Sequence, residues 1–512
     1  MDEGGTALRR TTPGASAEPQ PATGPQLTVR DAFRQVFPGV MVAMFLAAAD
    51  QTILASALPT IATRLGGFAY VSWVVVAYLL AATIAAPLYG HLGDRFGRKR
   101  MLLVALAVFT VASAACAAAP TLAALIGARA LQGLGGGGLM TLAQALIGEN
   151  IPPRERGRFQ GYFAGVFALA STSGPILGAY LTEHISWRSV FAINLPLGVL
   201  AAFLAWKIPA VAPPRHGRYR PDVFGTILFC LATVGLLFTL SSAGHALPFD
   251  SGRLYALIAV VLLGYAVLYW WERKSGHPVI PVRLLQRPEI MRPDAVVICF
   301  AATLFATVLY LPLYLQLGRG LGIGTSGTLL LPITLSMVTG ATITGRLVSL
   351  TGAVKPFPII GLSVATVALI ALGAMIGIAS TSVVLILTAF TGVGLGMVMP
   401  AMQVAVQHAA GRESLGAAIG SMSLCRSIGG AIGVAAIGAI IFLSIEHAGG
   451  ALGAVLRHVM DAGPGSIEQL SAADRAAIAD QLDHSFSIAF FSIAAITAIG
   501  TLLATTVPKP RF

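Results

Sequence analysis

Two ionisable residues of opposite charge stand inside long apolar runs of this sequence. Asp50 lies in the middle of the run 38–62, and Arg129 lies within the run 121–148. A charge at membrane depth is costly, so such a residue faces a water-filled cavity or pairs with another charge. Burial favours the neutral form of a carboxyl group, and a neighbouring cation favours the charged form. Asp50 is therefore predicted to bind and release protons with Arg129 as its partner, although a structural carboxylate at a local helix break also fits the position.

A short basic segment follows the second apolar run. Its sequence is Gly90-His91-Leu92-Gly93-Asp94-Arg95-Phe96-Gly97-Arg98-Lys99-Arg100, and it separates the runs 70–91 and 101–119. Lys and Arg in a tight loop between two spans keep that loop on the cytoplasmic side. The charges alone predict only membrane topology. The glycines, which permit a tight turn, and Asp94, which can accept hydrogen bonds and pair with an arginine, indicate a more specific motif.

The composition places these residues in a membrane protein. Of the 512 residues, 56% are hydrophobic and only 11% are charged, and the mean hydropathy is +0.80. Soluble domains do not have such values, and the sequence lacks the short alternating segments of a transmembrane barrel. We therefore expect an all-α polytopic membrane protein. The net charge of +12 lies in short loops, which indicates topology and contact with anionic lipid rather than with nucleic acid.

Long apolar runs predict about fourteen transmembrane helices, each long enough to cross a bilayer. They cover residues 38–62, 70–91, 101–119, 121–148, 159–182, 189–207, 222–243, 253–271, 294–317, 327–350, 357–378, 381–407, 417–445 and 485–507. Most of the 33 Lys and Arg residues then fall in connections on one side of the membrane. The few on the other side are Arg64, Arg188, Arg253, Arg319, Arg457 and Arg475. With its high Ala and Arg content, the chain is predicted to cross a bacterial plasma (inner) membrane with both termini in the cytoplasm.

Glycine patterns in the first half of the chain recur in the second half. Gly90-x-Leu92-x4-Gly97 recurs as Gly345-x-Leu347-x4-Gly352, and Gly133-x-Gly135-x-Gly137 recurs as Gly392-x-Gly394-x-Gly396. The charges do not recur, because Asp94 corresponds to Ser349, Arg129 to Thr388 and, by a weaker match, Asp50 to Thr303. Two copies of a bundle related by an axis along the membrane normal suit alternating access at their interface.

The repeat predicts two six-helix bundles with a pair of helices inserted between them. The predicted segments are a disordered cytoplasmic tail (1–37), the N-terminal bundle (38–207), the inserted helices 7 and 8 with their linker (208–271), a cytoplasmic linker (272–293), the C-terminal bundle (294–507) and a cytoplasmic C-terminus (508–512).

Further candidates lie within the predicted spans. The predicted helix 5 contains the segment Gly174-Pro175-Ile176-Leu177-Gly178. Its proline removes one backbone hydrogen bond, and its glycines bend the helix or make it narrower. The segment is either a kink for packing or a hinge at the interface of the two bundles. The candidate cavity residues are Gln51, Gln132 and Arg426.

Together, the motifs resemble the fourteen-helix drug:proton antiporters of the major facilitator superfamily, the EmrB/QacA type. The resemblance covers residues 38–507 and rests on Asp50 to Pro59, Gly90 to Arg100, Arg129 to Gly136, and Gly174-Pro175 with Gly178. It implies a major facilitator fold and proton-coupled export of lipophilic drugs or other amphiphilic small molecules by alternating access. It also implies roles for individual residues: proton coupling for Asp50 and Arg129, a cytoplasmic gate motif for Gly90, Asp94, Arg95, Gly97, Arg98 and Lys99, and an antiporter motif for Gly174, Pro175 and Gly178.

The substrate is not determined by the motifs. One deep carboxylate suits lipophilic monocations or neutral amphiphiles, while a dedicated exporter of one metabolite, lipid or antibiotic and a passive uniporter or channel remain alternatives. A membrane enzyme is a distant alternative, because the sequence contains no Gly-x-Ser-x-Gly, His-Glu-x-x-His or Walker motif. We expect no catalytic residue and no cofactor. The four cysteines lie in apolar runs, and no disulfide or metal site is predicted.

The outer connection 446–484 is acidic, unlike the other connections. Ser471 followed by Asp474 predicts a short surface helix from Ala472 to Leu482. The connection is either a solvated linker or an element that binds a partner, and a periplasmic adaptor protein is the partner to consider.

Overall fold

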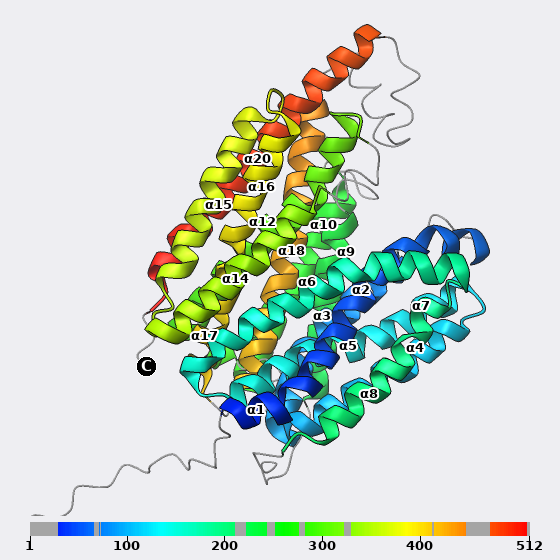
Figure 1. The fold of residues 1–512 in the computed structure, drawn as a ribbon, viewed down its shortest axis with the longest axis vertical. Coiled ribbons are helices and arrows are strands. Elements are labelled where there is room, and N and C mark those ends of the chain that lie inside the picture. Colours follow the sequence, from blue (N-terminus) through cyan, green and yellow to red (C-terminus); the bar gives the residue numbers. More distant parts are fainter. Residues whose placement is uncertain are drawn as a thin grey trace, which may run out of the picture.

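The computed structural model describes residues 29–65, 71, 73–209, 222–242, 251–275, 282–321, 329–411, 414–446 and 472–508, and these are almost entirely helical (Figure 1). The predicted all-α fold is confirmed. In the described residues, thirteen helices are long and apolar enough to cross a membrane. Residues 1–28 of the predicted disordered tail 1–37 lie outside the described residues. The tail was wrong over Val29–Gln35, which form a helix.

The N-terminal half begins with a short helix, α1 (Val29–Gln35). Its further helices are α2 (Phe37–Leu65), α3 (Trp73–Phe96), α4 (Arg98–Ala118), α5 (Leu122–Asn150), α6 (Pro153–His184) and the consecutive pair α7 (Ser189–Ala192) and α8 (Asn194–Trp206). One buried cluster joins five of these helices through Leu46, Phe109, Leu142, Phe159 and Ala201.

Helix α5 is not among the thirteen apolar helices. Arg129, Gln132 and a run of glycines make it less apolar than its neighbours, yet it has 29 residues and packs against both α3 and α4. The close packing is possible because Gly133, Gly135 and Gly137 leave no Cβ between the helices. Its crossing of the membrane as a fourteenth span stays a prediction.

The C-terminal half has its own buried core. Its helices are α12 (Pro288–Leu317), α14 (Leu331–Thr351), α15 (Pro356–Met375), α16 (Thr381–Gly396), α17 (Val398–Ala410), α18 (Leu415–Glu446) and α20 (Ala472–Thr506), preceded by the short α11 (Val282–Leu285). Two buried clusters, one around Leu362, Leu395 and Val404 and one around Leu311, Phe486 and Phe490, hold these helices together.

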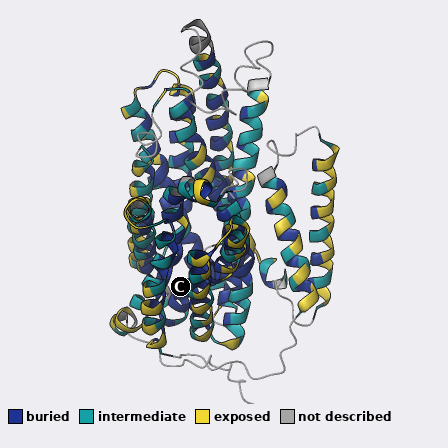
Figure 2. Cartoon of the chain, turned by 90° about the vertical axis from the view of Figure 1, so that its right-hand side faces the viewer, coloured by how far each residue is buried: buried dark blue, intermediate teal, exposed yellow. Residues whose placement is uncertain are grey.

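Two helices lie between the halves in sequence, α9 (Val223–Ser242) and α10 (Gly252–Lys274). They pack against each other, and α9 also contacts α3 and α18. A small buried cluster around Ile84, Phe229 and Leu268 makes this attachment. The outer surface of the bundle is rich in exposed apolar side chains, and buried residues concentrate in its interior (Figure 2). This pattern is expected where lipid is the solvent.

Four predicted boundaries differ from the structure. The predicted surface helix Ala472–Leu482 is wrong as a separate element, because it is the first part of α20. The predicted sixth span is divided at Ile193 and the twelfth at Met397. The predicted linker 272–293 contains α11 and the start of α12, since Pro288 stands at the first turn of that helix, where its missing N–H costs nothing. Residues 447–471 of the outer connection, Ser471 included, lie outside the described residues.

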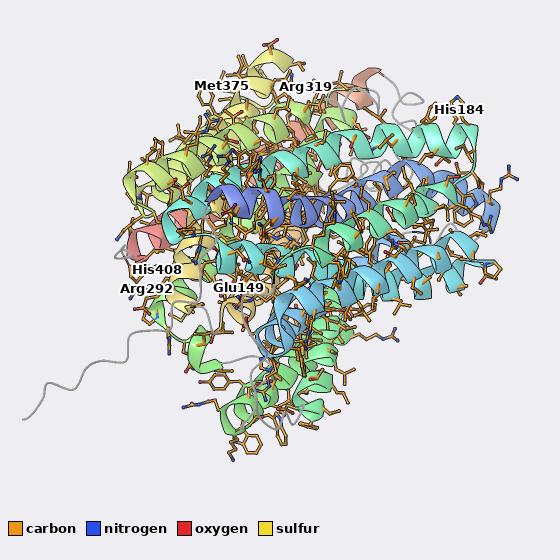
Figure 3. All side chains as sticks on the ribbon, turned by 60° about the horizontal axis from the view of Figure 1, so that its bottom comes forward. Glu149, His184, Arg292, Arg319, Met375 and His408 are labelled. Atoms are coloured by element: carbon orange, nitrogen blue, oxygen red, sulfur yellow. The ribbon has the colours of Figure 1, made fainter. Side chains whose placement is uncertain are left out.

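The two halves meet at one end of the molecule. We call it the basic end because Arg95 lies in the last turn of α3 there, and Arg98, Lys99 and Arg100 begin α4. Only Gly97 separates the two helices, so the predicted loop is reduced to one residue. There α3 packs against α18, and α6 packs against α14. Gln403 of α17 also donates a hydrogen bond to Gln144 of α5. Glu149, Arg292 and His408 lie together at the basic end (Figure 3). Toward the opposite, far end the two halves diverge (Figure 1).

Candidate functional site

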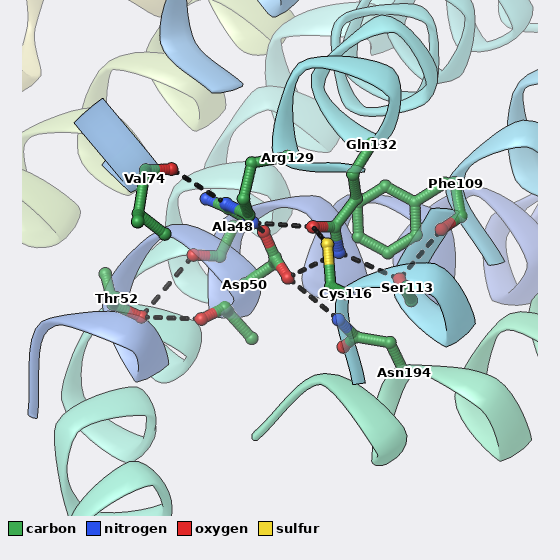
Figure 4. A network of polar contacts seen from close by, with 11 residues as sticks. Ala48, Asp50, Thr52, Val74, Phe109, Ser113, Cys116, Arg129, Gln132 and Asn194 are labelled. Atoms are coloured by element: carbon green, nitrogen blue, oxygen red, sulfur yellow. Dashed lines mark hydrogen bonds and ion pairs between the residues drawn. The ribbon is translucent and has the colours of Figure 1, made fainter. Parts of the chain in front are cut away.

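Asp50 and Arg129 form a buried ion pair in the N-terminal half. One Asp50 carboxylate oxygen, Oδ2, accepts a hydrogen bond of 2.6 Å from Nη1 of Arg129 (Figure 4). Both side chains are 1% exposed. Asp50 lies on α2 and Arg129 on α5, so the predicted pair forms and links these two helices.

Two amide side chains complete the surroundings of the carboxylate. Oδ1 of Asp50 accepts hydrogen bonds of 2.8 Å from Nε2 of Gln132 and 2.8 Å from Nδ2 of Asn194. Gln132, predicted as a cavity residue, is fully buried in this state. Its Oε1 accepts from Arg129 at 2.7 Å, and its Nε2 also donates to Ser113 at 2.8 Å. Side chains from α2, α4, α5 and α8 therefore meet at one polar cluster.

The guanidinium of Arg129 is held on its remaining sides. Its Nε donates to the backbone carbonyl of Val74 at 3.0 Å. Its Cζ lies 4.3 Å from the centre of the Tyr78 ring and 5.8 Å from that of Phe191. An aromatic face attracts a cation, and the attraction is larger where water is excluded. Arg129 thus has partners that remain if Asp50 becomes neutral.

This arrangement is suited to exchange of a proton. Two amide donors and a guanidinium surround the carboxylate, so each of its oxygens accepts at least one hydrogen bond. A proton added to Asp50 would remove the attraction across α2 and α5 and one acceptor from the amides. Such a change alters helix contacts without any rearrangement of covalent bonds.

The glycines of the predicted antiporter motif pack directly behind Asp50. A Cβ on Gly174 would lie 2.1 Å from Oγ1 of Thr52, and one on Gly178 would lie 2.2 Å from the carbonyl oxygen of Ile53. Thr52 also donates a hydrogen bond of 3.0 Å to the carbonyl of Ala170 on α6. Pro175 is exposed within the helix. The motif therefore faces α2 of its own half, while the other part of α6, near Gly157, contacts the C-terminal half.

At the basic end, Asp94 of α3 binds the first turn of α18. Its two oxygens accept hydrogen bonds of 2.9 Å from the backbone N–H groups of Gly416 and Ala417. A carboxylate is favourable at a helix N-terminus, where backbone N–H groups are free and the helix dipole is positive. Asp94 also accepts from Arg98 at 2.7 Å, and Arg98 lies 3.3 Å from Glu149 at the end of α5. Asp94, a residue of the predicted gate motif, therefore joins the two halves.

The remaining predicted residues are more dispersed. Gly90 meets Gly416, and Gly97 ends α3 with a φ of 95°, a value that favours glycine. Arg95, in the last turn of α3, and Lys99, in the first turn of α4, are half-buried. Gln51, next to Asp50 in the sequence, is exposed, and Arg426 is half-buried on α18.

Some polar residues of the site have no sequence signature. Asn194 and Ser113 were not predicted, because an uncharged polar residue in an apolar run is as common in helix contacts as in binding sites. In the C-terminal half, Thr303 and Thr388 are buried and bond to Thr497 and to the carbonyl of Val384. Asp294 on α12 is buried there and accepts a hydrogen bond of 2.5 Å from Ser421.

Comparisons with known proteins agree on a family. The model of the family described as the Major Facilitator Superfamily matches residues 40–434. The chain is 33% identical over 404 residues to the multidrug transporter protein MdtP of Bacillus subtilis (strain 168), covering 79% of this chain and 74% of MdtP.

Two solved structures share the fold. The human organic anion transporter MFSD10 (TETRAN) superposes with a TM-score of 0.62 at 16% identity, over 92% of this chain and 99% of MFSD10. The proton:xylose symporter XylE superposes with a TM-score of 0.63 at 14% identity, over 94% of this chain and 97% of XylE. At these identities the likeness concerns the fold alone.

Proposed function

The chain belongs to the major facilitator superfamily of membrane transporters, and from this premise we propose that it is a proton-coupled antiporter exporting lipophilic small molecules. The multidrug relative MdtP supports export of amphiphilic compounds. The observation that carries the proposal is the fully buried Asp50–Arg129 pair, with the donors Gln132 and Asn194 around the same carboxylate. We place the chain in the fourteen-helix drug:proton antiporter type, with two bundles at 38–207 and 294–507 and the inserted helices within 208–271.

The orientation follows from the positive charges. We assign the basic end to the cytoplasm and the membrane to the bacterial plasma (inner) membrane, because Lys and Arg of short loops stay on the cytoplasmic side. The arrangement described above is then the state closed to the cytoplasm. Binding of a periplasmic adaptor protein at the outer connection 446–484 is a further point to test.

In the proposed mechanism, Asp50 alternates between two states. Charged, it holds α2 against α5 through Arg129. Protonated, it releases this attraction, and Arg129 keeps Gln132, the Val74 carbonyl and the Tyr78 ring as partners. Gly174 and Gly178 place α6 directly against α2 next to Asp50, so a movement of α2 on protonation also moves α6. The other end of α6, near Gly157, contacts the C-terminal half. Proton binding thereby shifts the balance between inward-facing and outward-facing states.

The substrate class follows from the charge of the site. One carboxylate with one guanidinium partner suits lipophilic monocations or neutral amphiphiles, since a divalent cation would need a second deep acid. The exposed side chain of Gln51, beside Asp50, is a polar group that a substrate can reach.

The test uses purified protein in proteoliposomes. Ethidium transport and proton movement are measured together for the wild type, Asp50→Asn and the control Asp480→Asn, which changes an exposed carboxylate of α20 in the same way. We expect coupled fluxes in the wild type and the control, and loss of coupling in Asp50→Asn. Dye movement without protons, or coupling preserved in Asp50→Asn, contradicts the proposal. Coupling of protons to one natural compound only would indicate a dedicated exporter.

A further inference from the structure

The two halves cross each other twice at the basic end, and the two crossings are copies of one contact. In the first, a Cβ on Gly90 of α3 would lie 2.2 Å from the carbonyl oxygen of Gly416 on α18. In the second, a Cβ on Gly345 of α14 would lie 2.1 Å from the carbonyl oxygen of Gly157 on α6. Gly90 and Gly345 are the corresponding glycines of the sequence repeat. Backbone therefore meets backbone at both points.

The crossings differ in charge. One helical turn after Gly90 comes Asp94, whose carboxylate bonds to the opposite half. One turn after Gly345 comes Ser349, which carries no charge. Instead, an arginine stands directly beside each glycine of the second crossing, Arg158 after Gly157 and Arg346 after Gly345. The second crossing thus has two cations, one from each half, where the first has an anion.

Neither arginine forms an ion pair with a described residue. The contact made by Arg158 is a hydrogen bond of 3.3 Å from its Nε to the hydroxyl of Tyr162 on the same helix. Closure of the two halves brings these like charges together, and two cations close to each other repel. An anion between them would turn the repulsion into attraction toward a common partner.

A cavity lies between these residues. Its volume is about 360 Å³, and both arginines line it. The other lining residues that matter here are Phe37, Tyr162, Val166 and Leu169, which give it an aromatic and aliphatic wall. Phe37 and Tyr162 pack with ring centres 5.3 Å apart, so part of this wall is built by side-chain packing. Cationic groups beside an apolar wall match a molecule with an anionic head and a hydrocarbon tail.

We propose that this cavity binds the phosphate headgroup of an anionic phospholipid, bridging Arg158 and Arg346. Both arginines lie within two turns of a helix end at the basic end, where α6 begins and α14 ends, which is the depth of headgroups rather than of the hydrocarbon core. The inner leaflet of a membrane supplies anionic headgroups at that depth. Arginine binds phosphate with two parallel N–H groups, which favours this assignment over a purely diffuse attraction.

The bound phosphate would act on conformation as well as on affinity. Its two partners belong to different halves, so the complete site exists only when the basic end is closed. A ligand that binds one state better shifts the population toward that state. An anionic lipid would thus join the two halves at the second crossing, as the Asp94 carboxylate joins them at the first.

The test measures lipid binding and thermal unfolding of the full chain in nanodiscs. The variants are Arg158→Gln, Arg346→Gln, the double variant, and Arg100→Gln, a control that removes an exposed charge from the same end outside the cavity. Phosphatidylglycerol bound by the purified protein is counted by native mass spectrometry. We expect each cavity variant to weaken its binding by at least about tenfold, since losing a charge-assisted hydrogen bond exceeds about 1.4 kcal/mol. Arg100→Gln should bind as the wild type does.

Two comparisons make the result decisive. If one phosphate bridges both arginines, the double variant loses little more affinity than either single variant, whereas independent diffuse attraction makes the losses add. The wild type should also unfold at a higher temperature in phosphatidylglycerol nanodiscs than in phosphatidylcholine nanodiscs. The double variant should unfold at the same temperature in both. Equal loss of binding in Arg100→Gln, additive losses, or the same stabilisation by inorganic phosphate in phosphatidylcholine nanodiscs would each overturn the lipid site. None of these readouts requires transport, so their outcome is separate from that of the antiport experiment.

Discussion

Gly90 and Gly416 meet backbone to backbone across the interface of the two halves. A Cβ on Gly416 would lie 2.3 Å from the carbonyl oxygen of Gly90, and one on Gly90 would lie 2.2 Å from that of Gly416. Backbone atoms cannot yield as a flexible side chain can, so any larger residue must separate α3 from α18. The closed basic end therefore depends on glycine at these two positions.

We predict that Gly90→Ala opens the basic end. The reporter is the substitution Ala145→Cys in a chain whose four native cysteines are replaced, because Ala145 is buried against Leu415 and Ile419 of the other half. Modification of the introduced thiol by a thiol reagent should be faster in Gly90→Ala than in the parent chain. The control is Gly127→Ala on α5, where a Cβ meets nothing within 4 Å. Equal rates for Gly90→Ala and Gly127→Ala would show that the crossing tolerates a methyl group.

A second prediction concerns the charge of Asp94. A carboxylate at a helix N-terminus is worth about 0.3–1 kcal/mol, and about 2 kcal/mol when it is partly buried. Asp94→Asn keeps an acceptor for one N–H of α18 but loses the charge, and Asp94→Ala loses both. In the Ala145→Cys reporter chain, the rate of thiol modification should therefore rise from the parent to Asn and again to Ala. A rate that is unchanged in Asp94→Ala would mean that the glycine crossings alone keep the basic end closed.

The Asp50–Arg129 pair predicts a double-mutant cycle in stability. Arg129→Gln leaves a buried carboxylate without its counter-charge, and breaking a buried pair in this way costs about 3–5 kcal/mol. Combining it with Asp50→Asn removes both charges, so the double variant should unfold at a higher temperature than Arg129→Gln alone. Thermal unfolding in detergent provides the measurement. Additive effects of the two substitutions would indicate that the pair contributes no coupling energy.

Asp222 predicts a pH-dependent stability of the inserted helices. It lies just before α9, where burial raises its pKa, but hydrogen bonds from the Gly225 N–H, Ser275 and Trp271 outweigh this effect and leave the pKa below its usual value. The charged form is thus the one the fold stabilises. Its contribution is complete above the pKa of an unfolded aspartate, about 3.9, and is lost as the pH falls through the lowered folded value.

The experiment compares Asp222→Ala and Asp222→Asn with the wild type between neutral and acid pH. Asn keeps a cap for α9 without a titrating group, since it is as good an N-cap as Asp. The wild type should exceed both variants in unfolding temperature at neutral pH, and its advantage over Asn should vanish in acid. Trp271 fluorescence reports the local contact. An advantage over Asn that persists below the folded pKa would contradict the role assigned to the charge.

Much of this architecture could be predicted because membrane segments are simple to recognise. Apolar runs predicted most helix boundaries within a few residues. The scarcity of buried charge predicted the pairing of Asp50 with Arg129, since no other acid lies mid-span in that half. Motifs that combine charge with glycine spacing indicated the major facilitator superfamily, and the family match confirmed the superfamily.

Other features depend on packing that no local pattern records. The break at Ile193 sets the start of α8, and with it Asn194, which donates to Asp50. The partners of the repeated glycines Gly90 and Gly345 are Gly416 and Gly157, and this pairing depends on how the two halves pack against each other. The separate surface helix was predicted because Ser471 followed by Asp474 resembles a helix N-cap pattern, and because the next apolar run begins only at residue 485. A helix backbone need not end where its surroundings change from water to lipid, and α20 continues.

That continuous helix has a practical consequence. The 35 residues of α20 span about 52 Å at about 1.5 Å per residue, against a hydrocarbon core of about 30 Å. The excess extends beyond the rest of the bundle at the far end (Figure 1). A protein embedded almost wholly in a micelle offers little by which its images can be aligned. A rigid helical domain fused in register to the start of α20 would supply that feature for electron microscopy, outside the regions proposed to bind protons, substrate or lipid.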